Sequence, residues 1–567
     1  MLHGGGILNQ EEHQSETSPL LGNGKFRYPT QANNVATDTE AATGNGTTDS
    51  ATPLASEPST GKLLIIMSSV WFGTFLAALD STIVATLSAP ISASFHSLSL
   101  LSWLASAYFI ANAAIQPISG RLTDIFSRRT GLIFSNTFFA AGNLICGLAT
   151  TEWVMIFGRI IAGMGGGGLT AISTFVGSDL VPLRRRGVWQ GLGNISFGVG
   201  AALGGVFGGW VNDTWGWRKA FLVQVPLTVI SGIVICFTVK VPVKISDKAK
   251  LKRVDFLGAI SLMSTLIFLL VGLNSGGNTV PWSHPLILTT FPLSVVSLLF
   301  FIYIESHRAS EPVIPVRLLL NRTVLSACLS NWFISMCVMS LIFYGPIYFQ
   351  VKGLSATAAG VRLIPQSIGT ALGSVSTGLV IRATGRYYIL NAIIQMTFVA
   401  ACVLVSTFNL NTPAWEPILA FLMSGIGYSG MLTTTLLALI SAVDHKNHSV
   451  ITSASYAFRS TGSAIGITIA SAVFQNILRI KLSATLGERD NAKEIIERLR
   501  DSLEEIRNLP VGWREAVQNV YMDALTAVFF TILGISILGA VVSLAMREHV
   551  LHKSLARNEG LASDIGH

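Results

Sequence analysis

The chain has 567 residues, of which half are hydrophobic and only 12% are charged, and its formal net charge is +8. Soluble domains carry about 25% charged residues, so this composition excludes an ordinary soluble enzyme. The positive charge does not indicate nucleic acid, because the basic residues lie between apolar runs without aromatic interleaving. No nucleophile–base set and no metal-ligand spacing is present, so the sequence predicts neither catalysis nor a metal or cofactor site.

The first segment of the chain, residues 1–60, is polar and rich in Gly, Ser, Thr, Asn and Glu. Its few large apolar residues cannot bury enough surface to fold, so we predict a disordered cytoplasmic tail. Within it, Glu16 is followed after three residues by Leu20 and Leu21, the pattern of an acidic dileucine sorting signal. Such a signal is bound as an extended peptide, so a sorting adaptor is the predicted partner of this tail.

From Lys62 onward, apolar runs of about 20 residues alternate with short polar segments. A run of this length crosses about 30 Å of hydrocarbon as a helix, and lipid offers no partners to the backbone of other structures. The sequence therefore predicts an all-α membrane protein with about fourteen spans. Their centres lie near residues 73, 110, 140, 165, 198, 230, 265, 294, 335, 370, 396, 426, 464 and 535.

Basic residues are concentrated in alternate loops, and positively charged loops stay in the cytoplasm. Both termini are therefore predicted to be cytoplasmic, which requires an even number of spans. The opposite short loops hold little beyond Arg218, Lys219 and Lys352. The basic loops contain Arg121, Arg128, Arg129, Arg184, Arg185, Arg186, Lys240, Lys244, Lys248, Lys250, Lys252, Arg253, Arg308, Arg317, Arg322, Arg382 and Arg386.

An internal repeat divides the chain into two halves. Residues 120–129 follow the second span and residues 378–386 follow the tenth, and each segment joins two helices through a short basic turn. Two related halves with a substrate site at their interface are expected of many transporters.

Helical apolar spacing at 494–507 also predicts a surface helix. The predicted parts are a six-helix bundle (61–240), two inserted helices (241–305), a second six-helix bundle (306–548) with a long extracytoplasmic loop (478–522), and a cytoplasmic tail (549–567).

The turn after the second span contains Gly120, Asp124, Arg128 and Arg129. Asp124 is able to accept hydrogen bonds from a helix N-terminus or an arginine and so hold two helices together. The turn resembles the loop motif of the major facilitator superfamily, in its fourteen-helix drug:proton antiporter branch, and the resemblance extends over residues 62 to about 550. It implies a major facilitator fold and a cytoplasmic gate at this loop. Ile125 and Ser127 depart from the motif, where the family usually has Arg and Gly.

Asp80 lies well inside the first apolar run. An ionised Asp at mid-membrane costs roughly 2.5–3.5 kcal/mol on insertion scales, so a functional reason for its presence is expected. A carboxyl group there is able to exchange a proton or to pair with a cationic substrate. The alternative is a structural Asp satisfied by Ser81, Thr82 or a neighbouring helix. Residues 79–84 resemble the first-helix signature of the same branch.

Two arginines are also placed inside spans. Arg159 lies one turn into the fourth span, which is costly unless the charge is paired or faces a water-filled cavity. The alternative is snorkelling to the interface or bonding to backbone carbonyls. Residues 159–163 resemble the family's arginine motif, which is tied to proton coupling, and residues 458–462 around Arg459 resemble a recurrent pattern of the thirteenth span. Together with Asp80, these arginines are the residues assigned to proton coupling or substrate binding.

The fifth span carries small residues about one helical turn apart. They are Gly200, Gly204, Gly208 and Gly209. This spacing lets helices approach closely, and close packing alone explains the pattern. It resembles the antiporter motif of the family, with Gly205 in place of the family's Pro. Among other polar residues inside spans, we select Gln116, Asn331 and Tyr344 as cavity candidates, with interhelical hydrogen bonding as the alternative.

The Ser-Pro-Leu-Leu stretch of the tail resembles fungal vacuolar members of this superfamily that move basic amino acids. The resemblance implies a proton-coupled antiporter carrying lysine, histidine and arginine across the vacuolar membrane. A cation does not accumulate in an acidic, positive compartment without a driving ion, and one pH unit is worth about 1.36 kcal/mol per proton. One alternative is a plasma-membrane exporter of drugs or xenobiotics with the same coupling. Another is a nutrient sensor that binds its ligand without transport.

Overall fold

The computed structural model describes residues 59–549, except 96–98, 182, 240–254, 277–279, 309–315 and 444–447, and except most of 487–510. In that last segment only 495, 496, 498, 499, 506 and 509 are described. The predicted sorting signal of Glu16, Leu20 and Leu21 lies outside the described residues, as do the rest of the N-terminal tail and residues 550–567.

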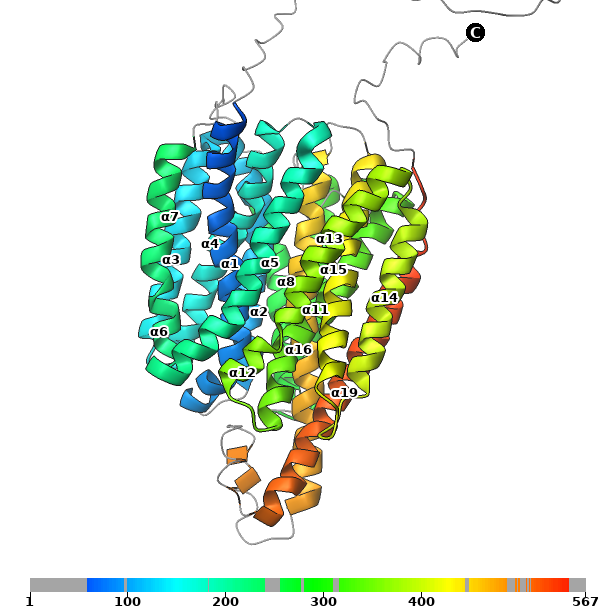
Figure 1. Cartoon of the computed structure of the whole chain (residues 1–567). Helices are drawn as coiled ribbons and strands as arrows, with labels where there is room; N and C mark the ends of the chain where they lie inside the picture. Colours follow the sequence, from blue (N-terminus) through cyan, green and yellow to red (C-terminus); the bar gives the residue numbers. More distant parts are fainter. Residues whose placement is uncertain are drawn as a thin grey trace, which may run out of the picture. The chain divides into compact units, whose positions relative to one another are not determined.

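The described residues form helices and no strand (Figure 1). The helices are α1 (Thr60–Phe95), α2 (Ser99–Phe126), α3 (Arg128–Leu148), α4 (Glu152–Leu180), α5 (Leu183–Trp215), α6 (Trp217–Leu222), α7 (Gln224–Thr238), α8 (Phe256–Ser275), α9 (Pro285–His307), α10 (Val316–Leu319), α11 (Arg322–Val351), α12 (Ala356–Val361), α13 (Ile364–Thr384), α14 (Tyr388–Ser406), α15 (Trp415–Ser441), α16 (His448–Leu486) and α19 (Val511–Ser543).

Every predicted span centre falls within one of these helices. In the described part of the chain, 12 segments are long and apolar enough to cross a membrane, which confirms an all-α membrane architecture. Helices α2 and α13 are not among those 12, so the number of fourteen spans stays a prediction. The span predicted near residue 230 consists of α6 and α7, which meet at Val223. Pro226 lies just after this junction and has no N–H to donate to the preceding turn.

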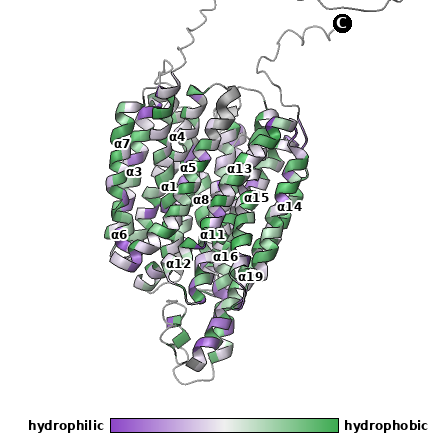
Figure 2. Ribbon diagram, viewed as in Figure 1, coloured by the Kyte–Doolittle hydropathy of each residue, from purple (hydrophilic) through white to green (hydrophobic). Residues whose placement is uncertain are grey.

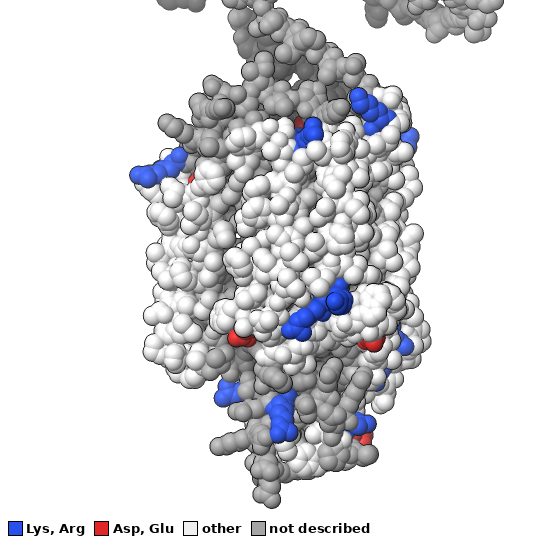
Figure 3. Space-filling view, turned by 90° about the vertical axis from the view of Figure 1, so that its left-hand side faces the viewer, with Lys and Arg blue, Asp and Glu red and all other residues white. Residues whose placement is uncertain are grey.

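Hydrophobic residues predominate along the helices (Figure 2). Large side chains such as Phe237 and Leu288 are 73% and 62% exposed, a pattern that suits contact with lipid. On the face in Figure 3, Lys, Arg, Asp and Glu gather towards the two ends, and the band between them is largely uncharged. Hydrocarbon therefore fits around the middle of the helices and water around their ends.

The helices pack as two groups with an added pair. Helices α1 to α7 contact one another, and so do α11, α13 to α16 and α19. Helix α8 packs against α2 of the first group and α16 of the second, while α9 packs mainly on α8. This arrangement agrees with two helices inserted between two six-helix halves. The halves meet along α2 and α16, where the hydroxyls of Ser106 and Thr468 are 2.9 Å apart, and along α5, which packs against α12 and α13.

The segment predicted as a long loop at 478–522 contains the ends of two long helices. Helix α16 continues to Leu486 and α19 begins at Val511, so both reach into the predicted loop. Lys481 and Asp523 form an ion pair of 2.6 Å between them. Within the predicted surface helix at 494–507, the described residues 495, 496, 498, 499 and 506 are helical, and the others lie outside the described part.

The membrane orientation of these helices is open to a direct test. Tags at the two termini are expected to be reachable only from the cytosol, because the basic loops lie on that side. A tag inserted near Asp490 is expected to be reachable only from the opposite side. Protease protection of tagged protein in sealed vesicles measures both accessibilities. Termini on opposite sides would rule out an even number of spans.

Candidate functional site

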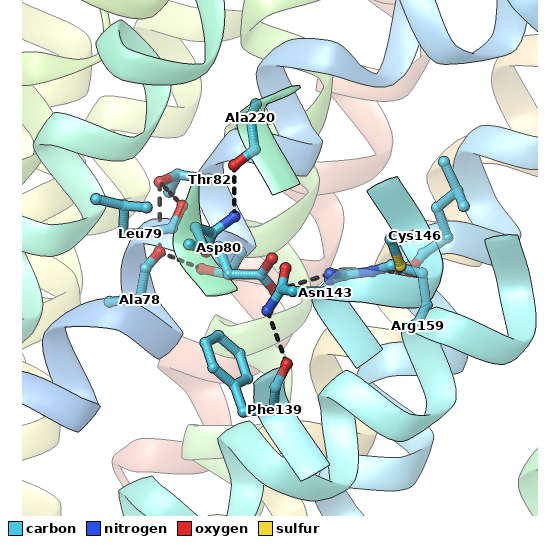
Figure 4. Close-up of polar contacts among 12 residues, drawn as sticks. Ala78, Leu79, Asp80, Thr82, Phe139, Asn143, Cys146, Arg159 and Ala220 are labelled. Carbon is cyan, nitrogen blue, oxygen red and sulfur yellow. Dashed lines mark hydrogen bonds and ion pairs between the residues drawn. The ribbon is translucent and has the colours of Figure 1, made fainter. Parts of the chain in front are cut away.

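A buried ion pair joins the first and fourth helices. The Nη1 atom of Arg159 lies 2.7 Å from Oδ2 of Asp80, and the two side chains are 1% and 0% exposed. Figure 4 shows the carboxylate of Asp80 directed toward Arg159. Two of the three residues predicted from the sequence to carry charge inside the membrane, Asp80 and Arg159, are therefore each other's partners. Pairing removes much of the cost of burying either charge alone.

The surroundings of Arg159 hold its guanidinium in place. Its Nε donates to the carbonyl of Leu104 at 3.3 Å, and its guanidinium carbon lies 4.4 Å from the ring centroid of Tyr108. The hydroxyls of Ser81 and Thr82 donate to backbone carbonyls of their own helix, at 2.7 and 3.1 Å, rather than to Asp80. Arg159 thus does not snorkel, and the polar partner of Asp80 lies on a neighbouring helix.

The pair leaves hydrogen-bonding capacity unused on one side. The Oδ1 atoms of Asp80 and of Asn143 on α3 are buried, and neither has a hydrogen-bond partner among the described residues. Asn143 lies beside Asp80 in Figure 4. Its amide orientation is set by Nδ2, which donates to the carbonyl of Phe139 at 3.0 Å. Each of these two oxygens therefore keeps an unused acceptor position.

Helix α5 lies directly against α1 beside Asp80. A Cβ atom on Gly204 would overlap the carbonyl of Leu79 and the hydroxyl of Thr82, so only glycine permits this approach. Gly200 and Gly208 face α1 in the same way, against Phe75 and Ile83. These three glycines therefore lie where α5 meets the helix that carries Asp80, and their role in helix packing stays a prediction.

Further along α5, the same stripe of glycines contacts the second half. Gly209 faces Thr357 of α12, and Gly205, which replaces the family's Pro, lies against Gly360. Thr357 also donates a hydrogen bond to Asp213. The two halves are therefore in close contact at this end of α5, which the predicted topology makes the extracytoplasmic end.

A pocket lies between the halves, toward the opposite end of the helices. It contains about 850 Å³ of empty space including its open mouth. Its walls come from α1, α4 and α5 of the first half and from α13, α15 and α16 of the second. On α5 it ends at Phe197, which a rise of about 1.5 Å per residue places about 12 Å from Gly205. The pocket is thus closed off at the end where α5 meets α12.

Five aromatic residues and one arginine are among the residues that line this pocket. The rings of Trp71 and Trp189 are 5.8 Å apart on the side of the first half. On the other side, Arg459 donates to the hydroxyl of Tyr428 at 3.0 Å and lies 5.1 Å from the ring centroid of Tyr456. Of the three charged residues predicted to act in coupling or binding, Arg459 alone is among the residues that line the pocket.

The three cavity candidates are not among the residues that line this pocket. Gln116 accepts a hydrogen bond from Ser460 at 3.1 Å, between α2 and α16. Asn331 donates to Ser455 at 3.0 Å and accepts from Thr435 at 3.2 Å. Tyr344 is buried, with its ring centroid 5.4 Å from that of Phe474. For Gln116 and Asn331 these contacts are those of the alternative, interhelical hydrogen bonding; a role in binding stays a prediction for all three.

Arg128 connects the turn after α2 to the end of α4. Arg128 donates to Asp179 of α4 at 2.8 Å and to the carbonyl of Gly120 at 3.2 Å. Its guanidinium carbon lies 5.2 Å from the ring centroid of Phe175. Arg129 donates to the sulfur of Cys236 at 3.0 Å. The side chain of Asp124 lies outside the described part, so the contacts predicted for it stay a prediction.

Ser127 is one of the two departures from the family's loop motif, and its backbone conformation shows how serine is accommodated there. Its φ of 137° is in the region that favours glycine, which is the residue usual in the family at this position. Its hydroxyl accepts a hydrogen bond from the backbone N–H of Thr130 at 3.1 Å and so caps α3. This hydrogen bond offsets part of the backbone strain that serine accepts here.

Several residues of the site escaped sequence analysis. Tyr108 under Arg159, Asp179 beside Arg128, and Asn143 beside Asp80 belong to helices far apart in the sequence. Asn143, Tyr428 and Tyr456 are polar residues inside predicted spans, but nothing in the sequence brings the first to Asp80 or the two tyrosines to Arg459. A pairing of an intramembrane charge with an aromatic ring is a weak signal without tertiary geometry.

Comparisons with known proteins agree with this architecture. Residues 70–467 match the model of the Major Facilitator Superfamily. Multidrug resistance protein fnx1 of Schizosaccharomyces pombe is 37% identical over 499 residues, which cover 87% of this chain and 94% of that protein. Vacuolar membrane amino acid uptake transporter fnx2 of the same yeast is 34% identical over 463 residues, covering 81% of this chain and 79% of that protein.

A third relative is Vacuolar basic amino acid transporter 1 of Saccharomyces cerevisiae, which is 30% identical over 532 residues, covering 86% of this chain and 93% of that protein. Among solved structures, a bacterial homolog to the human lysosomal transporter Spinster, in an inward-facing and unoccupied conformation, aligns with a TM-score of 0.56 at 13% identity. That alignment covers 86% of this chain and 98% of the bacterial one and concerns the fold alone. The family model matches most of the length of the chain. This chain therefore belongs to the major facilitator superfamily and is a multi-pass membrane transporter.

Proposed function

We propose that the protein is a proton-coupled antiporter that moves the basic amino acids lysine, histidine and arginine across the vacuolar membrane. The names of two relatives, one at 34% and one at 30% identity, support this substrate and this membrane. The buried pair of Asp80 and Arg159 is the observation that supports coupling, because one oxygen of its carboxylate is left without a partner.

Coupling proceeds through the ion pair in this proposal. A proton that binds Oδ1 of Asp80 neutralises the carboxylate and leaves the charge of Arg159 uncompensated, while Asn143 accepts the new hydrogen bond. An uncompensated charge inside the membrane is costly, so protonation favours a conformation in which Arg159 finds another partner or water. Helices α1 and α4 carry the pair and also line the pocket, so their rearrangement reaches the bound substrate.

The geometry argues against the simplest form of exchange, in which a proton and the substrate alternate on Asp80 itself. Asp80 is fully buried and is not among the residues that line the pocket. The nearest lining residue on its helix is Thr74, six positions away, which corresponds to about 9 Å along the axis. Proton and substrate sites are therefore separate in this proposal, and the helices between them transmit the coupling.

Uptake by purified protein in sealed vesicles tests the proposed function. Vesicles with an acidic interior are expected to accumulate labelled lysine, histidine and arginine, about tenfold per pH unit for each proton exchanged. Collapse of the gradient with an ionophore is expected to abolish accumulation but to leave exchange of lysine for lysine. Binding without any gradient-dependent or exchange flux would instead identify a non-transporting sensor.

A second candidate function is export of drugs or xenobiotics across the plasma membrane. The relative at 37% identity is named a multidrug resistance protein, and the aromatic walls of the pocket suit flat hydrophobic compounds. Uptake of a lipophilic cation such as ethidium in the same vesicles separates the two. Transport of ethidium without transport of lysine would favour the exporter.

Replacing Leu20 and Leu21 by Ala is expected to move the protein from the vacuolar membrane toward the cell surface. The physical reason is loss of the two apolar side chains that an adaptor would bind. Fluorescence microscopy of a tagged protein measures the redistribution. The matched control is Ile7→Ala with Leu8→Ala, because this apolar pair lies in the same tail but has no acidic residue before it. Normal delivery of the Leu20/Leu21 variant to the vacuole would show that this motif is not the sorting signal.

A further inference from the structure

Arg459 is a cation that faces the pocket, and no carboxylate of the described residues is paired with it. Its contacts in the described structure are with tyrosines: a hydrogen bond to Tyr428 and the face of the Tyr456 ring. The described salt bridges do not include it, and none of the residues that line the pocket is acidic. This distinguishes it from Arg159, whose charge is matched by Asp80 at 2.7 Å.

A guanidinium without a paired carboxylate, in a pocket between membrane helices, is stabilised by a bound anion or by water. Charged residues within membrane spans are costly and as a rule pair with an opposite charge or face a watery cavity. The guanidinium has five N–H donors in a planar fork, and its hydrogen bonds to Tyr428 and Tyr456 use only part of them. A carboxylate fits this fork with two parallel hydrogen bonds. An amine ligand has no pair of acceptor oxygens to make them.

We propose that Arg459 binds the carboxylate of the transported substrate, so that the pocket selects amino acids over amines without a carboxylate. This inference rests on the proposed function and adds which end of the substrate each wall of the pocket binds. The arginine side of the pocket belongs to α15 and α16 of the second half. A lysine whose carboxylate lies there has its side-chain ammonium directed away from Arg459, because like charges repel.

The opposite wall suits the cationic end of such a substrate. Trp71 of α1 and Trp189 of α5 lie on the first half, with ring centroids 5.8 Å apart. A cation over a tryptophan face is attracted by the ring quadrupole, most strongly when the site is desolvated. The substrate thus bridges the two halves, with its anionic group on the second and its cationic group on the first. Because the substrate contacts both halves, its contacts change when the two halves move apart.

Equilibrium binding by the purified full-length protein tests this inference without any proton gradient. Three probes differ in one group each: lysine, cadaverine, which is lysine without its carboxylate, and norleucine, which is lysine without its terminal amine. We expect lysine to bind at least about tenfold more tightly than cadaverine. Arg459→Gln is expected to weaken lysine binding about ten- to hundredfold, because charge-assisted hydrogen bonds are lost. Cadaverine binding is expected not to weaken, because the variant removes a repulsive charge and no favourable contact. The control Arg386→Gln removes an exposed arginine after α13 and is expected to change neither.

The outcomes separate this inference from the proposed function. Equal affinity for lysine and cadaverine in the native protein, or an equal loss for both in Arg459→Gln, would overturn the carboxylate site even if lysine accumulates in vesicles. Binding of norleucine but not lysine, lost in Arg459→Gln, would keep the carboxylate site and overturn basic amino acids as substrates. Binding of none of the three would overturn both. A melting temperature equal to that of the native protein shows that the variant is folded.

Discussion

Replacing both members of the buried pair, Asp80→Asn with Arg159→Gln, is expected to abolish accumulation driven by a pH gradient while preserving lysine exchange. The double variant removes the titratable carboxyl group and the charge that balances it, so no uncompensated charge stays in the membrane. Exchange survives because the pocket, including Arg459, is unchanged. Vesicle uptake with and without an imposed gradient, normalised to reconstituted protein, measures the two activities. Accumulation at the native level would show that the pair is structural.

The single variants serve as controls for the double variant. Asp80→Asn alone leaves Arg159 charged and buried, and breaking a buried pair costs about 3–5 kcal/mol, so this variant is expected to unfold at a lower temperature. Arg159→Lys is expected to impair transport less than Arg159→Ala, because lysine keeps the charge but loses the planar fork. Restored stability in the double variant, without restored accumulation, assigns the loss to coupling and not to folding.

Gly204→Ala is expected to destabilise the protein and to impair transport, although it adds a single methyl group. The added Cβ would overlap the carbonyl of Leu79, which is backbone and has no rotamer into which to move. Overpacking of this kind costs typically about 1–3 kcal/mol, and here it forces α1 away from α5 next to Asp80. Thermal unfolding in detergent and vesicle uptake measure the two effects.

The same helix provides the matched control. Gly191 also lies in α5, and a Cβ there would meet no atom within 4 Å. Gly191→Ala therefore adds the same methyl group without a clash and is expected to leave unfolding and uptake unchanged, or to stabilise slightly through helix propensity. Similar losses in both variants would show that α5 requires flexibility at its glycines rather than close contact at Gly204.

Hydropathy and charge were sufficient to predict most of the fold. An apolar run of about 20 residues has few options in lipid, so every span centre could be placed before any contact was known. The boundaries were less predictable near Leu486 and Val511, where α16 and α19 continue into the predicted loop. Polar helical residues there, such as Lys481 and Asp523, pair with each other across helices, which hydropathy does not register.

The site was only partly predictable, because its residues are assembled from different helices. Asp80 and Arg159 stand out individually as charges in apolar runs, but 79 positions separate them and periodicity within one helix does not reveal their contact. The contacts of Arg459 were not predictable either, because residues of both halves line its pocket. Gln116 and Asn331 show the converse: a polar residue in a span looks like a ligand-binding residue until its partner helix is known.

The position of α8 makes the two sides of the molecule unequal for a compound dissolved in the bilayer. Helices α2 and α16, which form one seam between the halves, both pack against α8, and α9 lies behind it. A hydrophobic compound approaching sideways from the acyl chains meets this helical hairpin on that side. Lateral entry is therefore expected only along the other seam, between α5 and α13, whose residues Phe197 and Thr370 already line the pocket. The inserted helices thus act as a one-sided barrier against lipid-borne molecules.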